Sequence, residues 1–186
     1  MKRMNNQKGF TLVEIAIVLV IIGLILGGIL KGQSMIENAK IKRVKSDIDS
    51  IVAAVYGYQD KYNYLPGDDP KNQFGLGPVG NGDGLLTTSD EQTMAWRDLI
   101  AGGFISGDAN QTSEALVAKV NPFGGKYLFR YRGATGENYI FVDNIPLDAA
   151  RTLDEKYDDG QYNSGDIQAN SDYTTTGVRD MYWYVF

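Results

Sequence analysis

Residues 10–30 read FTLVEIAIVLVIIGLILGGIL, with one charged residue, Glu14, and no proline. At about 1.5 Å per residue an α-helix of this length is about 30 Å long, which matches the hydrocarbon core of a bilayer. A helix that packs in a soluble core carries polar residues along one face, and this stretch has no such face. We therefore predict that residues 10–30 form a membrane-spanning helix.

The main alternative for this segment is a cleaved secretory signal peptide. Such a peptide has a shorter apolar region with a small-residue cleavage site after it. Here the apolar run ends in Gly-Gly-Ile-Leu-Lys, and the small residue that could precede a cut is Gly9, before the run. Basic residues lie on both sides of the span, so the charge rule leaves its orientation open.

The sequence KGFTLVEIAIVLVIIGLIL, residues 8–26, resembles the N-terminal motif of type IV pilins and type II secretion pseudopilins. That motif has a short basic leader, then G-F-T-L-x-E and a hydrophobic run. The resemblance implies that a prepilin peptidase cuts between Gly9 and Phe10 on the cytoplasmic side and methylates the new amino terminus of Phe10. It makes residues 1–9 a leader peptide and places the rest of the chain outside the cytoplasm.

Glu14 is a charge within the expected span, and at the centre of a bilayer it would cost at least about 2.5 kcal/mol when unpaired. The resemblance implies that it pairs with the Phe10 amino group of a neighbouring subunit during filament assembly. Such a pair would set the axial stagger between subunits. The alternative is a tolerated charge that reaches the interface, since Glu14 lies only about 6 Å from Phe10 along the axis.

Beyond the span, residues 31–62 continue the helical pattern as an amphipathic segment, and no proline occurs before Pro66. One helix from about Phe10 to Lys61 would be about 78 Å long. Its second half carries a stripe of apolar residues, mostly at three- and four-residue spacings, that we expect to pack on a globular head. The stripe consists of Ile36, Val44, Ile48, Ile51, Val52, Val55, Tyr58 and Tyr62.

Residues 63–186 form the expected globular head. It begins with a long loop rich in Gly, Pro, Asn and Asp, followed by a short helix with Ser89 as its N-cap and Gln92 three residues on. The expected elements are a loop at 63–88, a helix at 90–101, a strand hairpin within 126–145, a helix at 147–156 and a strand at 181–186. The fold class is therefore α+β and pilin-like, a long N-terminal helix packed on a small antiparallel sheet.

Composition excludes several classes of activity. The chain has no cysteine and no histidine, which removes disulfides, thiol catalysis, the Ser-His-Asp triad and the common zinc sites. Without Lys2, Arg3 and Lys8 it carries 15 basic and 23 acidic residues, a balance of −8. Such a body has no general affinity for nucleic acid. We expect no enzymatic activity and no nucleic-acid partner.

Two acidic, glycine-rich segments offer the oxygen ligands that calcium takes from carboxylates and carbonyls. One is Asn81–Gly84, and the other follows residue 153, with Asp154, Asp158, Asp159 and Asp166 as candidate calcium ligands. The resemblance adds that some type II secretion pseudopilins carry a calcium-stabilised C-terminal loop. The alternative is that Asp, Asn and Gly simply form turns here. No other cofactor is expected.

Two further groups of residues have a structural interpretation. The twelve tyrosines are expected to pack in the core and at interfaces. Glu91, Arg97 and Asp98 could be taken for an acid–base pair with a nearby cation, but no nucleophile accompanies them. We interpret them as a solvated helix face.

The sequence thus predicts a structural subunit of a pilin-like filament, held in the bacterial inner membrane by a single span with its head in the periplasm. Its expected partners are prepilin peptidase, copies of itself, other pilins or pseudopilins and the inner-membrane assembly platform. The filament would be periplasmic or extracellular. The absence of cysteine and the acidic head favour a type II secretion pseudopilin or a minor pilin, although the loop at 63–88 is long for a major pseudopilin. The alternative is a membrane-anchored binding module or enzyme that uses the helix only as an anchor.

Overall fold

The computed structural model describes residues 11–78 and 80–184. The proposed cleavage site between Gly9 and Phe10 lies outside the described residues. The chain divides into two compact units at the boundary between Ala39 and Lys40. The globular unit therefore includes the second half of the long helix in addition to the expected head.

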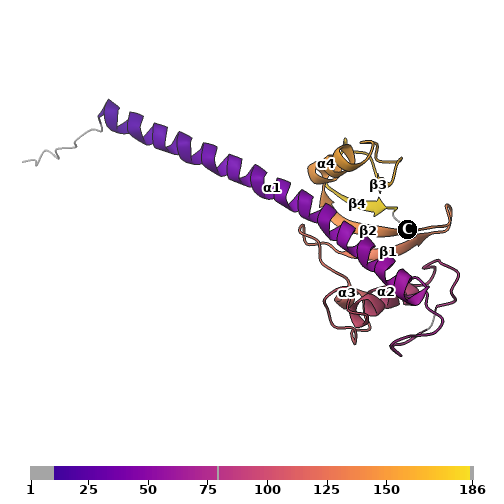
Figure 1. Cartoon of the computed structure of the whole chain (residues 1–186). Helices are drawn as coiled ribbons and strands as arrows, with labels where there is room; N and C mark the ends of the chain where they lie inside the picture. Colours follow the sequence, from indigo (N-terminus) through magenta and orange to yellow (C-terminus); the bar gives the residue numbers. More distant parts are fainter. Residues whose placement is uncertain (1–10, 79, 185–186) are drawn as a thin grey trace, which may run out of the picture. The chain divides into compact units, whose positions relative to one another are not determined.

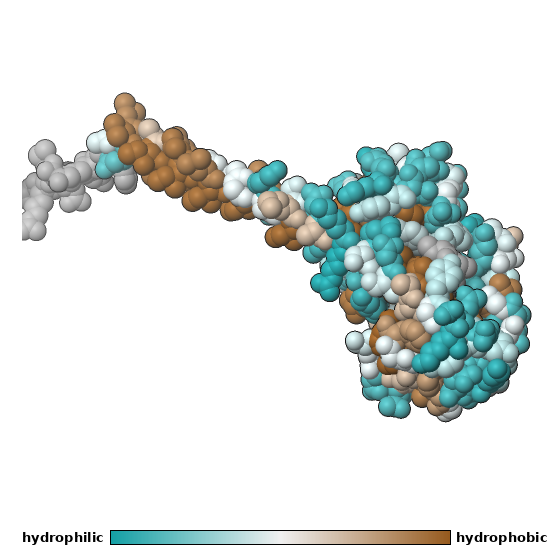
Figure 2. Space-filling model, viewed as in Figure 1, coloured by the Kyte–Doolittle hydropathy of each residue, from teal (hydrophilic) through white to brown (hydrophobic). Residues whose placement is uncertain are grey.

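The first unit is the start of helix α1 (Leu12–Tyr62), which is α-helical throughout its length. Gly23, Gly27 and Gly28 leave it unbroken. Every residue from 11 to 31 is exposed, up to 91% for Leu12, and Figure 2 shows a continuous apolar surface along this segment. Among the described residues this is a helix long and apolar enough to cross a membrane, judged by length and composition.

The second half of α1 belongs to the globular unit and packs on the sheet (Figure 1). Its buried apolar residues follow the helical period: Ile41, Val44, Ile48, Ile51, Ala54, Val55 and Tyr58. This confirms most of the expected stripe. Ile36 is an error in it, because this residue lies before the globular unit and is 61% exposed. Ile41 begins the buried stripe instead.

The head contains a four-stranded antiparallel sheet with the strand order β1-β2-β4-β3. The strands are β1 (Tyr127–Arg132), β2 (Glu137–Pro146), β3 (Ile167–Ala169) and β4 (Val178–Trp183). The expected hairpin is confirmed as β1–β2, closed by a turn with Gly136 at φ +76°. The last strand begins at Val178, earlier than expected. Strand β3 was not expected from the sequence, because three residues are too few to show an alternating pattern.

Alternation along the strands gives the sheet two different faces. Tyr127, Phe129, Ile140 and Met181 are fully buried, and the Tyr127 hydroxyl donates to Asp47 Oδ2 of α1 at 3.1 Å. The residues between them are only partly buried, as the pattern of β4 shows. One face therefore packs against α1 and forms the core, and the other face points away from it.

Three helices complete the head: α2 (Ser89–Ala101), α3 (Glu114–Val117) and α4 (Leu147–Tyr157). The helices expected at 90–101 and 147–156 are confirmed, whereas the single turn α3 was missed. The expected N-cap, Ser89, is wrong by one residue. The Thr88 hydroxyl accepts from Glu91 N at 3.1 Å and Glu91 Oε2 accepts from Thr88 N at 2.9 Å, so that both orphan donors are satisfied.

The interpretation of Glu91, Arg97 and Asp98 as a solvated face is also wrong, since all three residues are buried. Glu91 caps α2, and Arg97 Nε donates to the carbonyl of Ala109 at 2.8 Å. Asp98 Oδ2 accepts from the backbone N–H of Gly67 at 2.8 Å. The loops before and after α2 therefore cover the helix face that was expected from the sequence to be exposed to solvent.

Candidate functional site

The start of α1 forms a capping box that uses the charged residue of the span. Glu14 Oε2 accepts from Thr11 N at 2.8 Å and from Thr11 Oγ1 at 2.9 Å, and Glu14 N donates back to Thr11 Oγ1 at 3.2 Å. This reciprocal arrangement satisfies free backbone donors at a helix start, where the helix dipole also favours an anion. This local role of Glu14 was not expected from the sequence.

The same carboxylate keeps a free oxygen. Within the described residues, Glu14 Oε1 has no hydrogen-bond partner, and the side chain is exposed on an apolar helix. The capping box lowers the free-energy cost of placing the charge in an apolar segment. It leaves Oε1 able to accept a hydrogen bond from a cationic group. Phe10, the expected source of that cation in a neighbouring subunit, lies outside the described residues.

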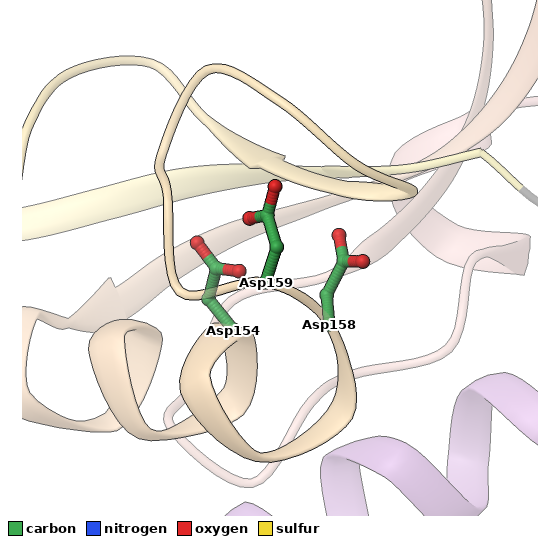
Figure 3. Close-up of side chains that lie close together, drawn as sticks. All are labelled: Asp154, Asp158 and Asp159. Carbon is green, nitrogen blue, oxygen red and sulfur yellow. The ribbon is translucent and has the colours of Figure 1, made fainter.

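The C-terminal acidic segment brings three of its four candidate ligands together (Figure 3). One oxygen each of Asp154, Asp158 and Asp159 lies within 4.8 Å of the other two. Asp154 is in the last turns of α4, and the other two residues follow the helix directly. Asp166 is not a member of this group. It precedes β3, and its carbonyl accepts from Tyr184 N at 2.8 Å.

Hydrogen bonds within the protein hold these carboxylates. Asp154 accepts from the Tyr173 hydroxyl at 2.6 Å and from Gly160 N at 3.0 Å. Asp158 Oδ2 accepts from Ile167 N at 2.7 Å and leaves Oδ1 without a partner among the described residues. The carboxylates therefore order the loop that leads to β3, and the free oxygen of Asp158 remains available to a cation.

Titration of two of the three acids is shifted in opposite directions. Burial raises the pKa of Asp154, and the neighbouring Asp159 and Asp158 carboxylates raise it further. Hydrogen bonds from Ser164 and Gln161 lower the pKa of Asp159. A cation beside Asp154 would relieve this repulsion, and hard oxygen ligands suit calcium.

The other acidic segment, Asn81–Gly84, folds around an aspartate of the protein itself. Asp68 is 1% exposed and accepts from Asn81 N at 3.1 Å, Gly82 N at 2.7 Å and Gly84 N at 2.7 Å. These backbone donors enclose a carboxylate, and the side chains of Asn81 and Asp83 bond to each other at 2.8 Å. The composition of this segment is explained by a turn that binds Asp68, as the alternative interpretation held.

A comparison with known protein families matches residues 4–30 to the prokaryotic N-terminal methylation motif. Comparison with curated proteins and with solved structures gave no match. The matched range contains Gly9, Phe10 and Glu14. The motif and the long apolar segment of α1 fit a membrane-anchored protein. This chain therefore carries the prepilin-type methylation motif that is the hallmark of type IV pilins and pseudopilins.

Proposed function

We propose that this protein is a structural subunit of a pilin-like filament, assembled through the first half of α1. The observation that supports it most directly concerns the carboxylate of Glu14. Among the described residues only its Oε2 is hydrogen-bonded, and Glu14 lies on an exposed apolar helix segment within the methylation motif. A plain membrane anchor needs neither an acidic residue at this depth nor a peptidase motif beside it.

In this proposal, prepilin peptidase cuts between Gly9 and Phe10 and methylates Phe10. The new Phe10 amino group of one subunit then pairs with Glu14 of the next. Neighbouring helices replace lipid around the exposed apolar residues, which keeps the span out of water when it leaves the membrane. Gly23, Gly27 and Gly28 have open space around their backbones, which allows close helix packing.

The proposed place of the head is the periplasm, with the filament in the periplasm or outside the cell. The acidic composition and the absence of cysteine support a type II secretion pseudopilus or a minor subunit of a type IV pilus. The other candidate remains a membrane-anchored binding module or enzyme. It would use the same helix but would have no need of Glu14.

The capping box allows the charge of Glu14 to be tested apart from its local role. Glu14→Gln keeps an oxygen that can accept from Thr11 N, because Gln also serves in capping boxes, but it removes the charge. Thr11→Val removes the capping hydroxyl and keeps the charge, and is the matched control. Both variants are produced in a host with its own assembly machinery, and sheared filaments and membranes are quantified by immunoblot.

We expect Glu14→Gln to reduce the filament fraction by about tenfold or more, since a charge pair worth about 1.4 kcal/mol gives that factor. Thr11→Val should have a smaller effect, and both proteins should remain in the membrane. Mass spectrometry of the wild-type protein should find N-methylated Phe10 at the amino terminus. Normal assembly of Glu14→Gln would refute the pairing, and a chain that still begins near Met1 would refute the processing.

We further propose calcium binding by Asp154, Asp158 and Asp159, with the remaining ligands supplied by carbonyl groups or water. The support is that these three acids place one carboxylate oxygen each within 4.8 Å of one another. Isothermal titration of the full-length protein with calcium tests this. Asp158→Asn should abolish the heat of binding, whereas Asp166→Asn should retain it. If both variants bound calcium equally, Asp154, Asp158 and Asp159 would not form the calcium site.

A further inference from the structure

The face of the sheet that points away from α1 carries a hollow of about 480 Å³, within the usual size range of small-molecule sites. We call it the tyrosine hollow, and its main walls are Arg132, Tyr139, Asn163, Gln168, Tyr182 and Tyr184. Five of these residues come from the four strands or, for Tyr184, from the end of β4, and Asn163 comes from the loop between α4 and β3. Gln168 of β3 pairs with Tyr182 of β4, so their side chains share one face.

The aromatic walls of the tyrosine hollow hold one another in place. The ring of Tyr139 lies 5.5 Å from that of Tyr182 and 5.4 Å from that of Tyr184, measured between centroids. Arg132 Nη1 donates to the Tyr184 hydroxyl at 2.6 Å and to Gln168 Oε1 at 3.3 Å. The walls are therefore ordered before any ligand arrives, which reduces the entropy lost on binding.

Several polar groups at the hollow make no hydrogen bond to any residue that the structure describes. Within the described part of the chain, the hydroxyls of Tyr139 and Tyr182 and the side-chain amide of Asn163 make no hydrogen bond. A phenol hydroxyl can both donate and accept, and an amide offers both kinds of group. Burial raises the pKa of Tyr139 and of Tyr182, so both phenols stay protonated at neutral pH.

The charge around the hollow restricts its ligand. Its lining contains one guanidinium, that of Arg132, and the Asp180 carboxylate beside Tyr182 accepts from Asn170 Nδ2 at 3.2 Å. The lining itself contributes no carboxylate, so it does not offer the set of charged oxygen ligands that a hard metal ion takes. The chain without its first three basic residues carries a balance of −8, which opposes a polyanion such as a nucleic acid. Peptides usually add to a sheet edge or enter an apolar groove, whereas this site lies on the face of a sheet among polar groups.

We propose that the tyrosine hollow binds a neutral oligosaccharide. The partly exposed rings of Tyr139, Tyr182 and Tyr184 offer apolar surface to the C–H groups of sugar rings, and the phenol and amide groups match hydroxyls that donate and accept. This inference is independent of the filament role, because it rests on the head alone. It would give the protein a contact with a glycan, whether from a cell wall or from another surface.

The test uses the full-length protein in lauryldimethylamine oxide, a detergent without a sugar head group. The probes are chitotetraose, an oligomer of N-acetylated sugars as in cell walls, and the plain hexose oligomers cellotetraose and maltotetraose. Binding is measured by saturation-transfer NMR and titration calorimetry at millimolar sugar. We expect at least one probe to bind, and the identity of that probe separates the two sources of glycan.

The variant Tyr139→Phe/Tyr182→Phe keeps both rings and removes only the free hydroxyls. We expect its dissociation constant to rise about fivefold for each lost hydrogen bond. Tyr56→Phe, an exposed tyrosine on α1, is the matched control and should bind like the wild type. Near-ultraviolet circular dichroism confirms that all variants are folded.

Failure of all three sugars to bind would overturn the proposal, as would binding that the double variant leaves unchanged. Polyuridylate and an unstructured peptide serve as the other ligand classes. Binding of either one with no binding of sugar would assign the tyrosine hollow to that class and not to a saccharide.

Discussion

The buried carboxyl group of Asp98 should make the stability of the head depend on pH. Asp98 is 5% exposed, and burial raises its pKa to about 6. The N–H of Gly67, which donates to Oδ2 at 2.8 Å, opposes this shift, and the nearby Asp69 adds to it. The substitution Asp98→Asn keeps an oxygen for Gly67 and removes the titration.

The magnitude follows from the difference between the two pKa values. A shift from 3.8 to about 6 corresponds to about 3 kcal/mol. Because the folded pKa lies above the unfolded one, the folded state holds a proton that the unfolded chain releases between these values. The stabilisation by the protonated carboxyl is complete below pH 3.8 and is lost as the pH rises through about 6.

The assay is urea unfolding of the full-length protein in detergent micelles at a series of pH values from 4 to 8, followed by near-ultraviolet circular dichroism. We expect the free energy of unfolding of Asp98→Asn, minus that of the wild type, to increase by about 2.5 kcal/mol between pH 4 and pH 8, because the unfolded carboxyl is already partly ionised at pH 4. Other titrating groups cancel in this difference. Asp90→Asn removes an exposed charge from the same helix and is the control. Parallel curves for wild type and Asp98→Asn would refute the burial argument.

Other substitutions test the loops and caps of the head. Asp68→Ala leaves three backbone N–H groups of the turn without their acceptor, and should cost about 3 kcal/mol and lower the melting temperature by about 6–12 °C. Amide exchange should speed up first at Gly82 and Gly84, and unchanged protection there would contradict the assigned contacts. Thr88→Ala should cost about 1 kcal/mol in thermal unfolding, and Ser89→Ala much less; the reverse order would return the N-cap to Ser89. If calcium binds at Asp154, adding chelator should lower the melting temperature of the wild type but not that of Asp158→Asn.

The elements that sequence reasoning located well are those encoded by neighbouring residues. The helix α1, the β1–β2 hairpin and α4 each follow from a local period or turn. Predictions from the sequence failed where two neighbouring residues could play the same local role and tertiary contacts determined which one does. Thr88 and Ser89 are both competent N-caps, and the choice of Thr88 places Glu91 in the box while Gln92 Nε2 donates to the carbonyl of Leu86 at 2.9 Å.

The buried acids show why composition alone misjudged α2. A run with Glu91, Arg97 and Asp98 looks solvent-facing, because charged side chains are almost never fully buried without partners. Their partners come from distant loops: Gly67 lies 31 residues before Asp98, and Ala109 lies 12 residues after Arg97. Hydrogen bonds between residues so far apart in the sequence cannot be predicted from its periodicity.

The amino-acid sequence by itself determined the N-terminal segment of this protein. A membrane span depends on a continuous run of apolar residues, and the methylation motif is likewise contiguous, so both are legible without a fold. Only the tertiary structure decided the rest. It enclosed Asp68 in the Asn81–Gly84 turn, separated Asp166 from the acidic cluster and joined Arg132 to Tyr184 across 52 residues. These contacts depend on strand pairing and loop packing between distant parts of the chain, and that information resides in the whole fold rather than in any local stretch.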